Sequence, residues 1–467
     1  MLFPTLDYLL FLPLAVALYW AAGRHRLWVL AGASLLFYAS WSIEYLGALL
    51  LVTATAWVSA WLRERTGRVG WVATLLALFA PLIAFKYWDW LAWNAEAAAG
   101  FLGAEVTLPR VALGLPVGIS FFTFQAVAYA VDARRREAEP ARPLPFFAFL
   151  AFFPQLVAGP IVRVKELMPQ LTAARPLLKP GDVGEGMFRI TKGMVKKLLI
   201  ADLIKASMVD PVFADPQTYG GLEVMISLYA YTLQIYYDFS AYTDIAIGSA
   251  LLFGIRLPEN FRRPYKAISV AEFWRRWHIT LSNWVRDYIY YPLGGSRMAS
   301  DWLVYRNILL TMVTIGIWHG ASWNFVIYGI LHGTAVSVNR WRRMVTGRHT
   351  FDPVDTTWGW VWRFALTFHF VVLCRILFRA TDLAHAVEIT GRLLDWQWLL
   401  PRFPPSVWAI LVVGYAIHFT PLSWLEALKR RFVALPPLAQ AALAVGAAAA
   451  CWTMGTGDQL AFIYYQF

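Results

Sequence analysis

The sequence predicts an all-α protein that crosses a membrane many times. Of its 467 residues, 59% are hydrophobic and only 15% are charged, whereas a soluble domain is about half apolar and about a quarter charged. Apolar stretches of about 20 residues, the length of a membrane-spanning helix, recur along the whole chain. The 24 Trp and 21 Tyr residues suit the aromatic belts at the two surfaces of a bilayer.

These apolar stretches predict about 11–12 transmembrane helices in a single integral-membrane domain. The expected crossings are 5–21, 27–41, 45–62, 70–91, 112–131, 188–213, 222–255, 302–318, 322–339, 358–378, 405–420 and 434–452. The domain divides into N-terminal helices (1–140), a central part with His278 and His319 (141–340), and C-terminal helices (341–467).

The distribution of Lys and Arg orients the chain with its N-terminus outside. The loops that then lie inside hold the basic segments 24–26, 63–68, 134–136, 262–286, 340–348 and 429–431, as the positive-inside rule requires. The net charge of +12 is therefore assigned to these loops rather than to a nucleic-acid surface. Residues 1–20 are apolar before any positive charge, the reverse of a cleaved signal peptide, so we expect a retained first span.

Two stretches differ from simple membrane spans. Residues 143–160 are apolar but end in Gln155-Leu-Val-Ala-Gly-Pro160 on the expected inner side, which indicates a re-entrant hairpin. Residues 257–301 mix basic and aromatic residues with Pro and Gly, which predicts short helices that lie at the inner interface.

His319 ends an apolar run, in the sequence Ile315-Gly-Ile-Trp-His-Gly-Ala-Ser-Trp-Asn324. If Arg306 lies near the inner surface, a helix from there places His319 roughly 20 Å into a core of about 30 Å. Ionisable residues at such depth are costly and usually mark function. A buried histidine that hydrogen-bonds between helices explains the position equally well, so depth alone leaves both interpretations open.

His278 lies in a segment, 273–290, that is both basic and aromatic. On a single helix, His278 would share a face with Trp274 and Trp277, while the arginines would fall elsewhere. Such a helix can offer cations to phosphate groups and present His278 to a cavity. It can equally be an interfacial anchor with its aromatics in lipid and its arginines on headgroups.

Two carboxylates, Asp238 and Asp244, interrupt another apolar run, with Ser240 between them. Carboxylates at membrane depth are expected to face protein or water and to be paired. Asp238 either orients a histidine, as a carboxylate does in a catalytic triad, or forms a structural pair with an arginine or a tyrosine.

Several motifs of other enzyme classes are missing from the sequence. It has no G-x-S-x-G nucleophile elbow, no Walker A loop, no dinucleotide fingerprint and no H-E-x-x-H motif. We expect no metal site, and the two cysteines, Cys374 and Cys451, lie in apolar surroundings that indicate no disulfide. Four further histidines are interpreted as structural: His332, His369, His385 and His418.

The two histidine segments are joined by others in a characteristic order. The main pair is Trp274-Arg-Arg-Trp-His-Ile-Thr-Leu-Ser282 and Gly316-Ile-Trp-His-Gly-Ala-Ser-Trp-Asn324, and the further segments are 37–38, 118–125, 153–161, 237–244, 258–261 and 462–467. Together they resemble the membrane-bound O-acyltransferase (MBOAT) superfamily. Within it, the pattern is most similar to the bacterial alginate O-acetyltransferase membrane subunit.

This resemblance implies an MBOAT-like fold, with re-entrant and interfacial helices around a central tunnel, in the bacterial inner membrane. It implies that His319 and His278 are the two signature histidines and that His319 is catalytic. It also implies that acetyl-CoA is the acyl donor, with no permanently bound cofactor. The acetyl group would cross the membrane through the protein, and a periplasmic partner of the SGNH-hydrolase type would place it on an exported polysaccharide such as alginate.

The chemistry of acyl transfer assigns roles to these residues. Neutral histidine suits proton transfer near pH 7, so His319 would take the proton of the acceptor hydroxyl and return it to the leaving thiolate. A transient acyl group on His319 is the alternative, and His278 would position the donor carbonyl or stabilise the oxyanion. The residues expected to bind substrate are Trp274, Trp277, Ser282, Asn283, Trp318, Asn324, Asp238 and Ser240. The residues expected to contact the phosphates of acetyl-CoA are Arg262, Arg263, Lys266, Arg275 and Arg276.

Other functions stay open on the sequence. The same fold serves peptidoglycan O-acetylation or D-alanyl transfer, while a proton-coupled transporter or a scaffold for periplasmic enzymes would share the apolar composition. An acetyltransferase predicts release of coenzyme A from acetyl-CoA, whereas a transporter predicts transport without cleavage of the thioester.

Overall fold

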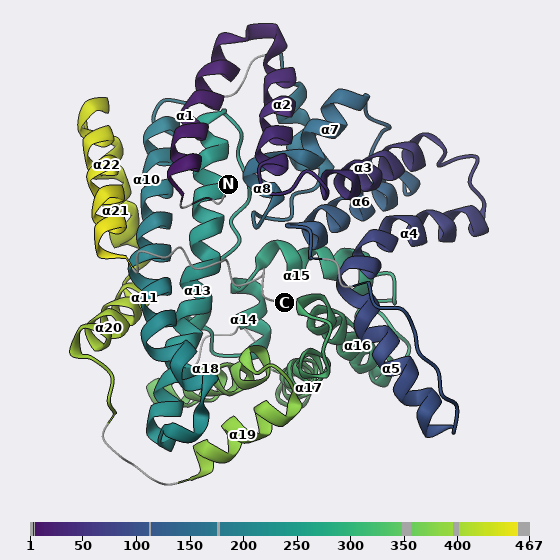
Figure 1. Ribbon diagram of the computed structural model, residues 1–467, viewed down its shortest axis with the longest axis vertical. Coiled ribbons are helices and arrows are strands. Elements are labelled where there is room, and N and C mark those ends of the chain that lie inside the picture. Colours follow the sequence, from purple (N-terminus) through teal and green to yellow (C-terminus); the bar gives the residue numbers. More distant parts are fainter. Residues whose placement is uncertain are drawn as a thin grey trace. The chain divides into compact units, whose positions relative to one another are not determined.

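The computed structural model describes residues 3, 5–111, 114–174, 178–347, 356–395 and 401–455. Within these ranges every regular element is a helix, which confirms the predicted all-α class (Figure 1). The matching segment at the end of the chain, 462–467, lies outside the described residues.

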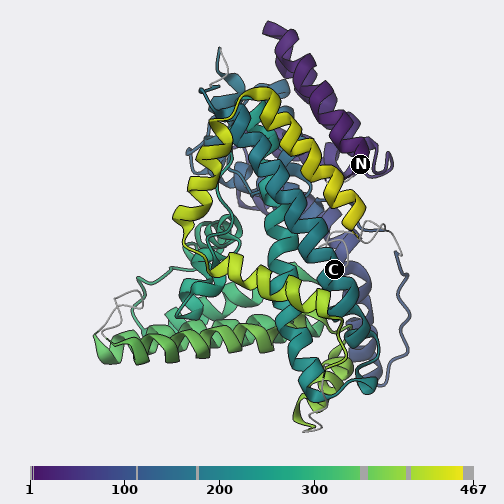
Figure 2. The same cartoon turned by 90° about the vertical axis from the view of Figure 1, so that its left-hand side faces the viewer.

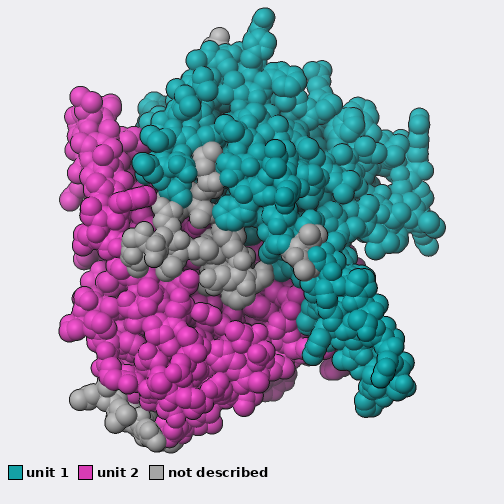
Figure 3. All heavy atoms as spheres, viewed as in Figure 1, with its two compact units in different colours: residues 1–186, 246–258 teal, residues 187–245, 259–467 magenta. Residues whose placement is uncertain are grey.

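The chain groups into two compact units, each built from parts far apart in the sequence (Figure 3). Unit 1 comprises residues 1–186 and 246–258, and unit 2 comprises residues 187–245 and 259–467. The internal boundaries expected at residues 140 and 340 do not coincide with those of the units. Every residue that the sequence singled out as a site residue lies in unit 2.

Unit 1 contains most of the N-terminal helices. They are α1 (Leu6–Ala21), α2 (Arg26–Ala39), α3 (Leu46–Trp61), α4 (Arg68–Leu82), α5 (Trp88–Phe101), α6 (Ile119–Arg134), α7 (Pro143–Ala151), α8 (Phe153–Leu156) and α9 (Val164–Thr172), with a π-helical segment, η2 (Ile83–Tyr87), between α4 and α5. Aromatic rings fill its centre, where Phe153 packs against Phe11, Phe37 and Phe253 at centroid distances of 5.2–5.8 Å. Such pairs add to the stability that burial alone supplies.

Residues 143–160 form a broken helical segment inside unit 1. Helix α7 ends before Phe152, whose backbone angles are not helical (φ −50°, ψ 103°), and the short α8 follows. A side chain on Gly118 would place its Cβ 2.2 Å from the carbonyl oxygen of Leu156, so the backbone here must approach a glycine with positive φ (74°). The segments 118–125 and 153–161 are therefore in contact, while re-entry of 143–160 into a membrane remains a prediction.

Unit 2 contains the remaining helices. They are most of α10 (Asp182–Met194), α11 (Asp202–Ile204), α12 (Asp210–Ala214), most of α13 (Gly221–Leu252), α14 (Val270–Arg276), α15 (Ile279–Val285), α16 (Asp301–His319), α17 (Trp323–Thr346), α18 (Thr357–Arg379), α19 (Leu383–Leu394), α20 (Pro405–Phe419), α21 (Leu422–Val433) and α22 (Pro437–Met454). Three π-helical segments accompany them: η3 (Val195–Ala201), η4 (Lys205–Val209) and η7 (Arg286–Tyr290).

Helices α16 and α17 form a tight hairpin, side by side in Figure 1. A Cβ on Gly316 would lie 2.1 Å from the carbonyl oxygen of Phe325, and one on Gly329 would lie 2.7 Å from that of Met312. The two helix backbones therefore approach each other closely at Gly316 and Gly329. Helix α16 is continuous as far as His319, so the helical path assumed between Arg306 and His319 is confirmed.

The segment 273–290 is not the single helix that its pattern suggested. Helix α14 ends at Arg276 and α15 begins at Ile279, and His278 between them has left-handed backbone angles (φ 43°, ψ 56°). The common helical face assumed for Trp274, Trp277 and His278 is therefore wrong. Few residues other than glycine adopt such angles, so the surrounding structure must hold His278 in place.

Three stretches of the described chain are long and apolar enough to cross a membrane: Arg68–Phe101, Thr357–Arg379 and Pro437–Met454. Helices α20 and α21 provide a fourth when taken as a pair, bent by 94° (Figure 2, yellow-green). Together with shorter apolar helices such as α1 and α3, they indicate a multi-pass membrane protein. The expected number of 11–12 crossings remains a prediction.

Candidate active site

Asn260 holds the turn that contains His278. Its side-chain oxygen accepts hydrogen bonds from the backbone nitrogen and from the hydroxyl of Thr280, at 3.1 Å and 2.9 Å. The same oxygen lies 3.2 Å from Nδ1 of His278. The backbone nitrogen of Ile279 donates to the carbonyl oxygen of Asn260 at 3.0 Å. Asn260 and His278 are both fully buried, so these bonds stabilise the unusual backbone between α14 and α15.

This hydrogen bond also determines which nitrogen of His278 carries the proton. A backbone N–H can only donate, so the atom that faces Thr280 is the amide oxygen of Asn260. Nδ1 of His278 is then the protonated donor, and Nε2 carries the lone pair. Burial lowers the pKa of His278 to about 3. Near pH 7 the ring is therefore neutral, and Nε2 can accept a hydrogen bond but not donate one.

The indole of Trp318 contacts both histidine rings. Its centroid lies 5.5 Å from the ring of His278 and 5.0 Å from that of His319. His319 is the buried last residue of α16, and its ring also packs against Phe378 at 4.8 Å and Tyr328 at 6.0 Å. Two histidines that are far apart in the sequence thus join one buried aromatic cluster.

His332 connects a second predicted substrate residue, Trp274, to this cluster. Nε1 of Trp274 donates a hydrogen bond to Nδ1 of His332 at 3.2 Å, so His332 carries its own proton on Nε2. The His332 ring lies 4.3 Å from that of Tyr328, which in turn contacts His319. His332 therefore makes structural contacts, and Tyr328 links it to His319, the catalytic candidate.

Arg375 is a fully buried cation beside the same rings. Its guanidinium lies 4.9 Å from the ring centroid of Trp277 and 5.5 Å from that of Phe378. Within the described ranges, Nε and Nη2, which form one edge of the guanidinium, have no hydrogen-bond partner. Its polar neighbours, Tyr265 and Tyr328, are phenols, which do not cancel a positive charge. A buried cation of this kind is costly unless a negative charge meets it.

Asp238 forms a buried ion pair with Lys197. The lysine Nζ lies 2.9 Å from Asp238 and 2.8 Å from Asp202, and all three side chains are almost completely buried. Asp238 thus takes part in a structural pair, the second of the two alternatives, although its partner is a lysine rather than an arginine or a tyrosine. The π-helical segment η3 carries Lys197 to this position.

Ser240 and Asp244 on α13 face a separate cluster of cations, which come from α10 and η3. The ammonium of Lys196 donates to its hydroxyl at 3.1 Å and to Asp244 at 2.7 Å. Lys192 lies 2.8 Å and Arg189 3.6 Å from the same carboxylate of Asp244. Ser240 therefore serves this cluster of cations, in which one carboxylate faces three positive charges.

The remaining predicted substrate residues lie near the two helix starts. Ser282 donates to the carbonyl oxygen of Trp277 at 3.5 Å, and Asn283 is half-buried on α15. Asn324 is buried, and its side chain donates to the carbonyl oxygen of Ala380 at 3.0 Å. Asn324 therefore ties the start of α17, next to His319, to the end of α18.

Four of the five basic residues expected to contact phosphate are linked to one another. The guanidinium of Arg276 donates to the carbonyl oxygen of Arg262 at 3.3 Å. Desolvation, and after it the positive charges of Arg263 and Arg276, lower the pKa of Lys266. Their contact with phosphate remains a prediction. Arg276 pairs with Glu272 on its own helix at 2.6 Å, and Arg275 is exposed. Arg262 is exposed as well, and its backbone nitrogen donates to the carbonyl oxygen of Arg276.

Arg263 and Lys266 differ from the other three because they adjoin a pocket. Arg263 lines it, and the ammonium of Lys266 lies 3.5 Å from the carbonyl oxygen of Thr420, which also lines it.

Three residues of the site escaped the reasoning from sequence. Asn260 lies in the matching segment 258–261 but carried no assigned role. Arg375 lies inside the apolar run 358–378, which also holds Arg363, and Lys197 follows Lys196 in the expected crossing 188–213. In both cases a charge inside an expected membrane span was the signal that could have found them. No group of three or more potential metal ligands is found among the described residues.

This arrangement suits proton transfer next to a developing negative charge. His278 carries its lone pair on Nε2, and Trp318 contacts both His278 and His319. The buried guanidinium of Arg375 lies against Trp277 and Phe378. Water-excluded surroundings strengthen such electrostatic interactions.

Known proteins are similar to this chain over most of its length. The model of the membrane-bound O-acyltransferase family, MBOAT, matches residues 90–378. A probable alginate O-acetylase, AlgI, of Pseudomonas putida is 37% identical over 402 residues, which cover 83% of this chain and 79% of that protein. A peptidoglycan O-acetyltransferase of Helicobacter pylori is 36% identical over 396 residues, covering 78% and 72%. A teichoic acid D-alanyltransferase of Bacillus subtilis is 28% identical over 279 residues, covering 58% and 70%.

The resemblance inferred from the histidine motifs is thereby confirmed. The family match includes His278, His319, Asn260 and Arg375, and relatives in three bacteria are named as acyl-transferring enzymes. The chain therefore belongs to the membrane-bound O-acyltransferase family and is an O-acyltransferase.

Proposed function

We propose that this protein passes an acetyl group from cytoplasmic acetyl-CoA across the inner membrane, for O-acetylation of an exported polysaccharide such as alginate. A periplasmic partner of the SGNH-hydrolase type would receive the acetyl group and place it on the polymer. The contact of Trp318 with both His278 and His319 carries the catalytic part of the proposal. The identity of 37% to a probable alginate O-acetylase supports the choice of acyl group and acceptor.

His319 is the proposed proton carrier of the transfer. An imidazole nitrogen takes the proton from the acceptor hydroxyl as its oxygen attacks the thioester carbonyl. The carbon–sulfur bond then breaks, and the same proton goes to the leaving thiolate, so that coenzyme A is released as a thiol. The alternative, a transient acetyl group on His319, requires the same residue and gives the same products.

The structure changes the role that we propose for His278. In the tautomer held by Asn260, Nε2 is an acceptor, so it cannot donate a hydrogen bond to a carbonyl oxygen or an oxyanion. We assign it instead to the hydroxyl or thiol of a substrate, which it would orient by accepting a hydrogen bond. His319 would then transfer the proton, and His278, which also contacts Trp318, would accept a hydrogen bond from the substrate.

Arg375 is the group that we propose for the negative charge of the reaction. The tetrahedral intermediate of acyl transfer carries an oxyanion, and the edge formed by Nε and Nη2 offers two parallel donors to it. The charge would form in a buried environment, where a fixed cation needs no reorganisation to stabilise it. Phe378, which contacts both Arg375 and His319, places this cation near the proton carrier.

Peptidoglycan is the second acceptor that a specific observation favours. The Helicobacter pylori relative is named a peptidoglycan O-acetyltransferase and is 36% identical over 78% of this chain. Both acceptors demand the same transfer of acetyl groups from inside to outside. They differ in the polymer that becomes acetylated and in the partner that completes the transfer.

Release of coenzyme A tests the proposal directly. Membrane vesicles with the protein and its partner should release coenzyme A from acetyl-CoA, and mass spectrometry should find acetyl groups on the exported polymer. A transporter would instead move a solute without cleaving the thioester. Acetylated alginate or acetylated peptidoglycan in the cells would decide between the two acceptors.

A further inference from the structure

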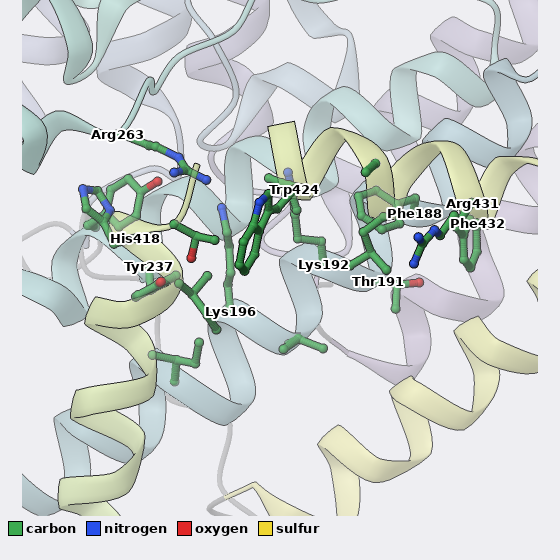
Figure 4. Close-up of a pocket in the computed structure, with 18 of the residues that line it drawn as sticks. Phe188, Thr191, Lys192, Lys196, Tyr237, Arg263, His418, Trp424, Arg431 and Phe432 are labelled. Carbon is green, nitrogen blue, oxygen red and sulfur yellow. The ribbon is translucent and has the colours of Figure 1, made fainter. Parts of the chain in front are cut away.

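A pocket of about 850 Å³ lies wholly within unit 2 and is separate from His278 and His319 (Figure 4). Its walls come from the end of α10, the segment η3, the middle of α13 and the C-terminal helices α20, α21 and α22. Neither proposed catalytic histidine lines it. The pocket is therefore separate from the proposed catalytic histidines, although Arg263, one of the five residues expected to contact acetyl-CoA, lines it.

Positive charge dominates the polar part of its lining. Lys192, Lys196, Arg263 and Arg431 all line the pocket, whereas none of the lining residues is acidic. Asp244 binds Lys192 and Lys196 at 2.8 Å and 2.7 Å and also faces Arg189, which pairs with Glu259 as well. Arg263 and Arg431 add further positive charge to the lining, so these two carboxylates leave the pocket with a net positive potential.

Buried polar groups at one end of the pocket lack partners. His418 is only 2% exposed, and neither of its ring nitrogens has a hydrogen-bond partner among the described residues. Nη1 of Arg263 is buried without one in the same part of the structure. Figure 4 shows Arg263 and His418 at the same end of the pocket, and the ring of His418 lies 4.7 Å from Tyr236, over which Lys196 is placed. Buried donors of this kind need acceptors, and an anion bound here would supply them.

The mouth of the pocket is apolar and open. Trp424, Leu428 and Leu443 line the pocket although they are 69%, 56% and 54% exposed. Two of them lie on α21, which turns away from α20 by 94° and carries Arg430 and Arg431 in its last turn. A helix with an apolar face and terminal arginines is typical of the interface between lipid tails and headgroups. A fully water-soluble anion would gain little from contact with these apolar side chains, whereas a lipid would bury its acyl chains against them.

We propose that this pocket binds an anionic phospholipid of the surrounding bilayer. Its phosphate would lie among Lys192, Lys196 and Arg263, with His418 as a further hydrogen-bonding partner. An acyl chain would leave through the apolar mouth past Trp424 and Leu428. The pocket volume suits a headgroup with the first part of its chains, since ligand pockets commonly measure about 300–1,000 Å³. The proposal is independent of the acetyl-transfer function.

Native mass spectrometry of the full-length protein tests this site. Protein released from detergent should retain phosphatidylglycerol at least tenfold better than phosphatidylcholine with the same acyl chains. The double substitution Lys196→Gln with Arg263→Gln should abolish that preference. Its fold should survive, because Lys192 and Arg189 remain to neutralise Asp244. The matched control is Lys165→Gln with Arg65→Gln, which removes the same charge from exposed positions and should leave the preference unchanged.

A second variant guards against loss of folding. His418→Phe keeps a ring beside Tyr236 and removes the buried nitrogens, so it should weaken phosphatidylglycerol retention while the melting temperature is kept. Equal retention of the two lipids by the wild-type protein would overturn the proposal, as would full retention by the double variant. Displacement of the lipid by soluble coenzyme A would also overturn it, since the pocket would then belong to the acyl donor.

Discussion

The side-chain oxygen of Asn260 lies 3.2 Å from Nδ1 of His278 and accepts two further hydrogen bonds from Thr280. One amide thus fixes the left-handed backbone of His278, the start of α15 and the tautomer of the ring. This relationship makes Nε2 of His278 a hydrogen-bond acceptor, because the proton of the neutral ring is on Nδ1.

Asn260→Asp should add a pH dependence to that of the wild-type protein. The carboxylate accepts the same hydrogen bonds but stabilises the imidazolium, so the pKa of His278 should rise from about 3 toward its ordinary value of 6.5. His278 would then become protonated, and lose its lone pair, as the pH falls through the raised pKa. The rate of coenzyme A release, measured from pH 5 to 9, should fall more steeply on the acidic side in the variant than in the wild-type protein. Superimposable profiles would refute the assigned tautomer.

His319→Ala should lower the rate of coenzyme A release by about 10²–10⁴-fold, the usual contribution of a general acid–base group. The side chain is buried at the end of α16, so protein level and melting temperature must be recorded alongside the rate. His369→Ala is the matched control, because His369 is exposed on α18 and should be replaceable without effect. Undiminished acetylation by the His319→Ala protein would exclude it as the catalytic histidine.

Arg375→Met should keep the fold and lower the rate by about 10²–10³-fold, as loss of one oxyanion donor does. Met has a similar length and packs against Trp277 and Phe378, and removal of a buried charge without a carboxylate partner need not destabilise the protein. Arg375→Lys keeps the charge without the planar edge, so it should recover only part of the rate. A fully active Met variant would show that Arg375 has no part in the reaction.

Lys197→Met should destabilise the protein by about 3–5 kcal/mol, because it leaves Asp202 and Asp238 buried without their cation. The expected observation is a lower melting temperature and poor recovery of monodisperse protein from detergent. Lys165→Met, at an exposed position, controls for the loss of a lysine. Unchanged stability would mean that the buried pair does not exist in the folded protein.

Gly316→Ala should disrupt the hairpin of α16 and α17. The new methyl group would lie 2.1 Å from the carbonyl oxygen of Phe325, and backbone atoms cannot move aside as a flexible side chain can. Gly446→Ala in α22 meets no atom within 4 Å and should be neutral or stabilising by up to about 1 kcal/mol. Thermal unfolding of both variants in the same detergent makes the comparison, and equal melting temperatures would contradict the close packing.

The class of the protein follows from local features of the chain. Composition and the length of the apolar runs predicted helices throughout, and the continuous α16 confirmed the run that ends at His319. The ordered segments around His278 and His319 resemble those of the family that the comparisons confirmed. Helical periodicity failed at 273–290, because the hydrogen bonds that the side-chain oxygen of Asn260 accepts outweigh the local preference for a continuous helix.

The sequence by itself therefore determined the all-α membrane class, the family and the two candidate histidines, because these depend on composition and on short segments. Only the tertiary structure decided which groups meet. Lys197 finds Asp238, Arg375 finds Trp277, and His418 joins a cationic pocket with Arg263 and Lys196. A buried charge must be stabilised by whatever the fold places beside it. Those neighbours come from helices that are distant in the chain, where no local pattern records them.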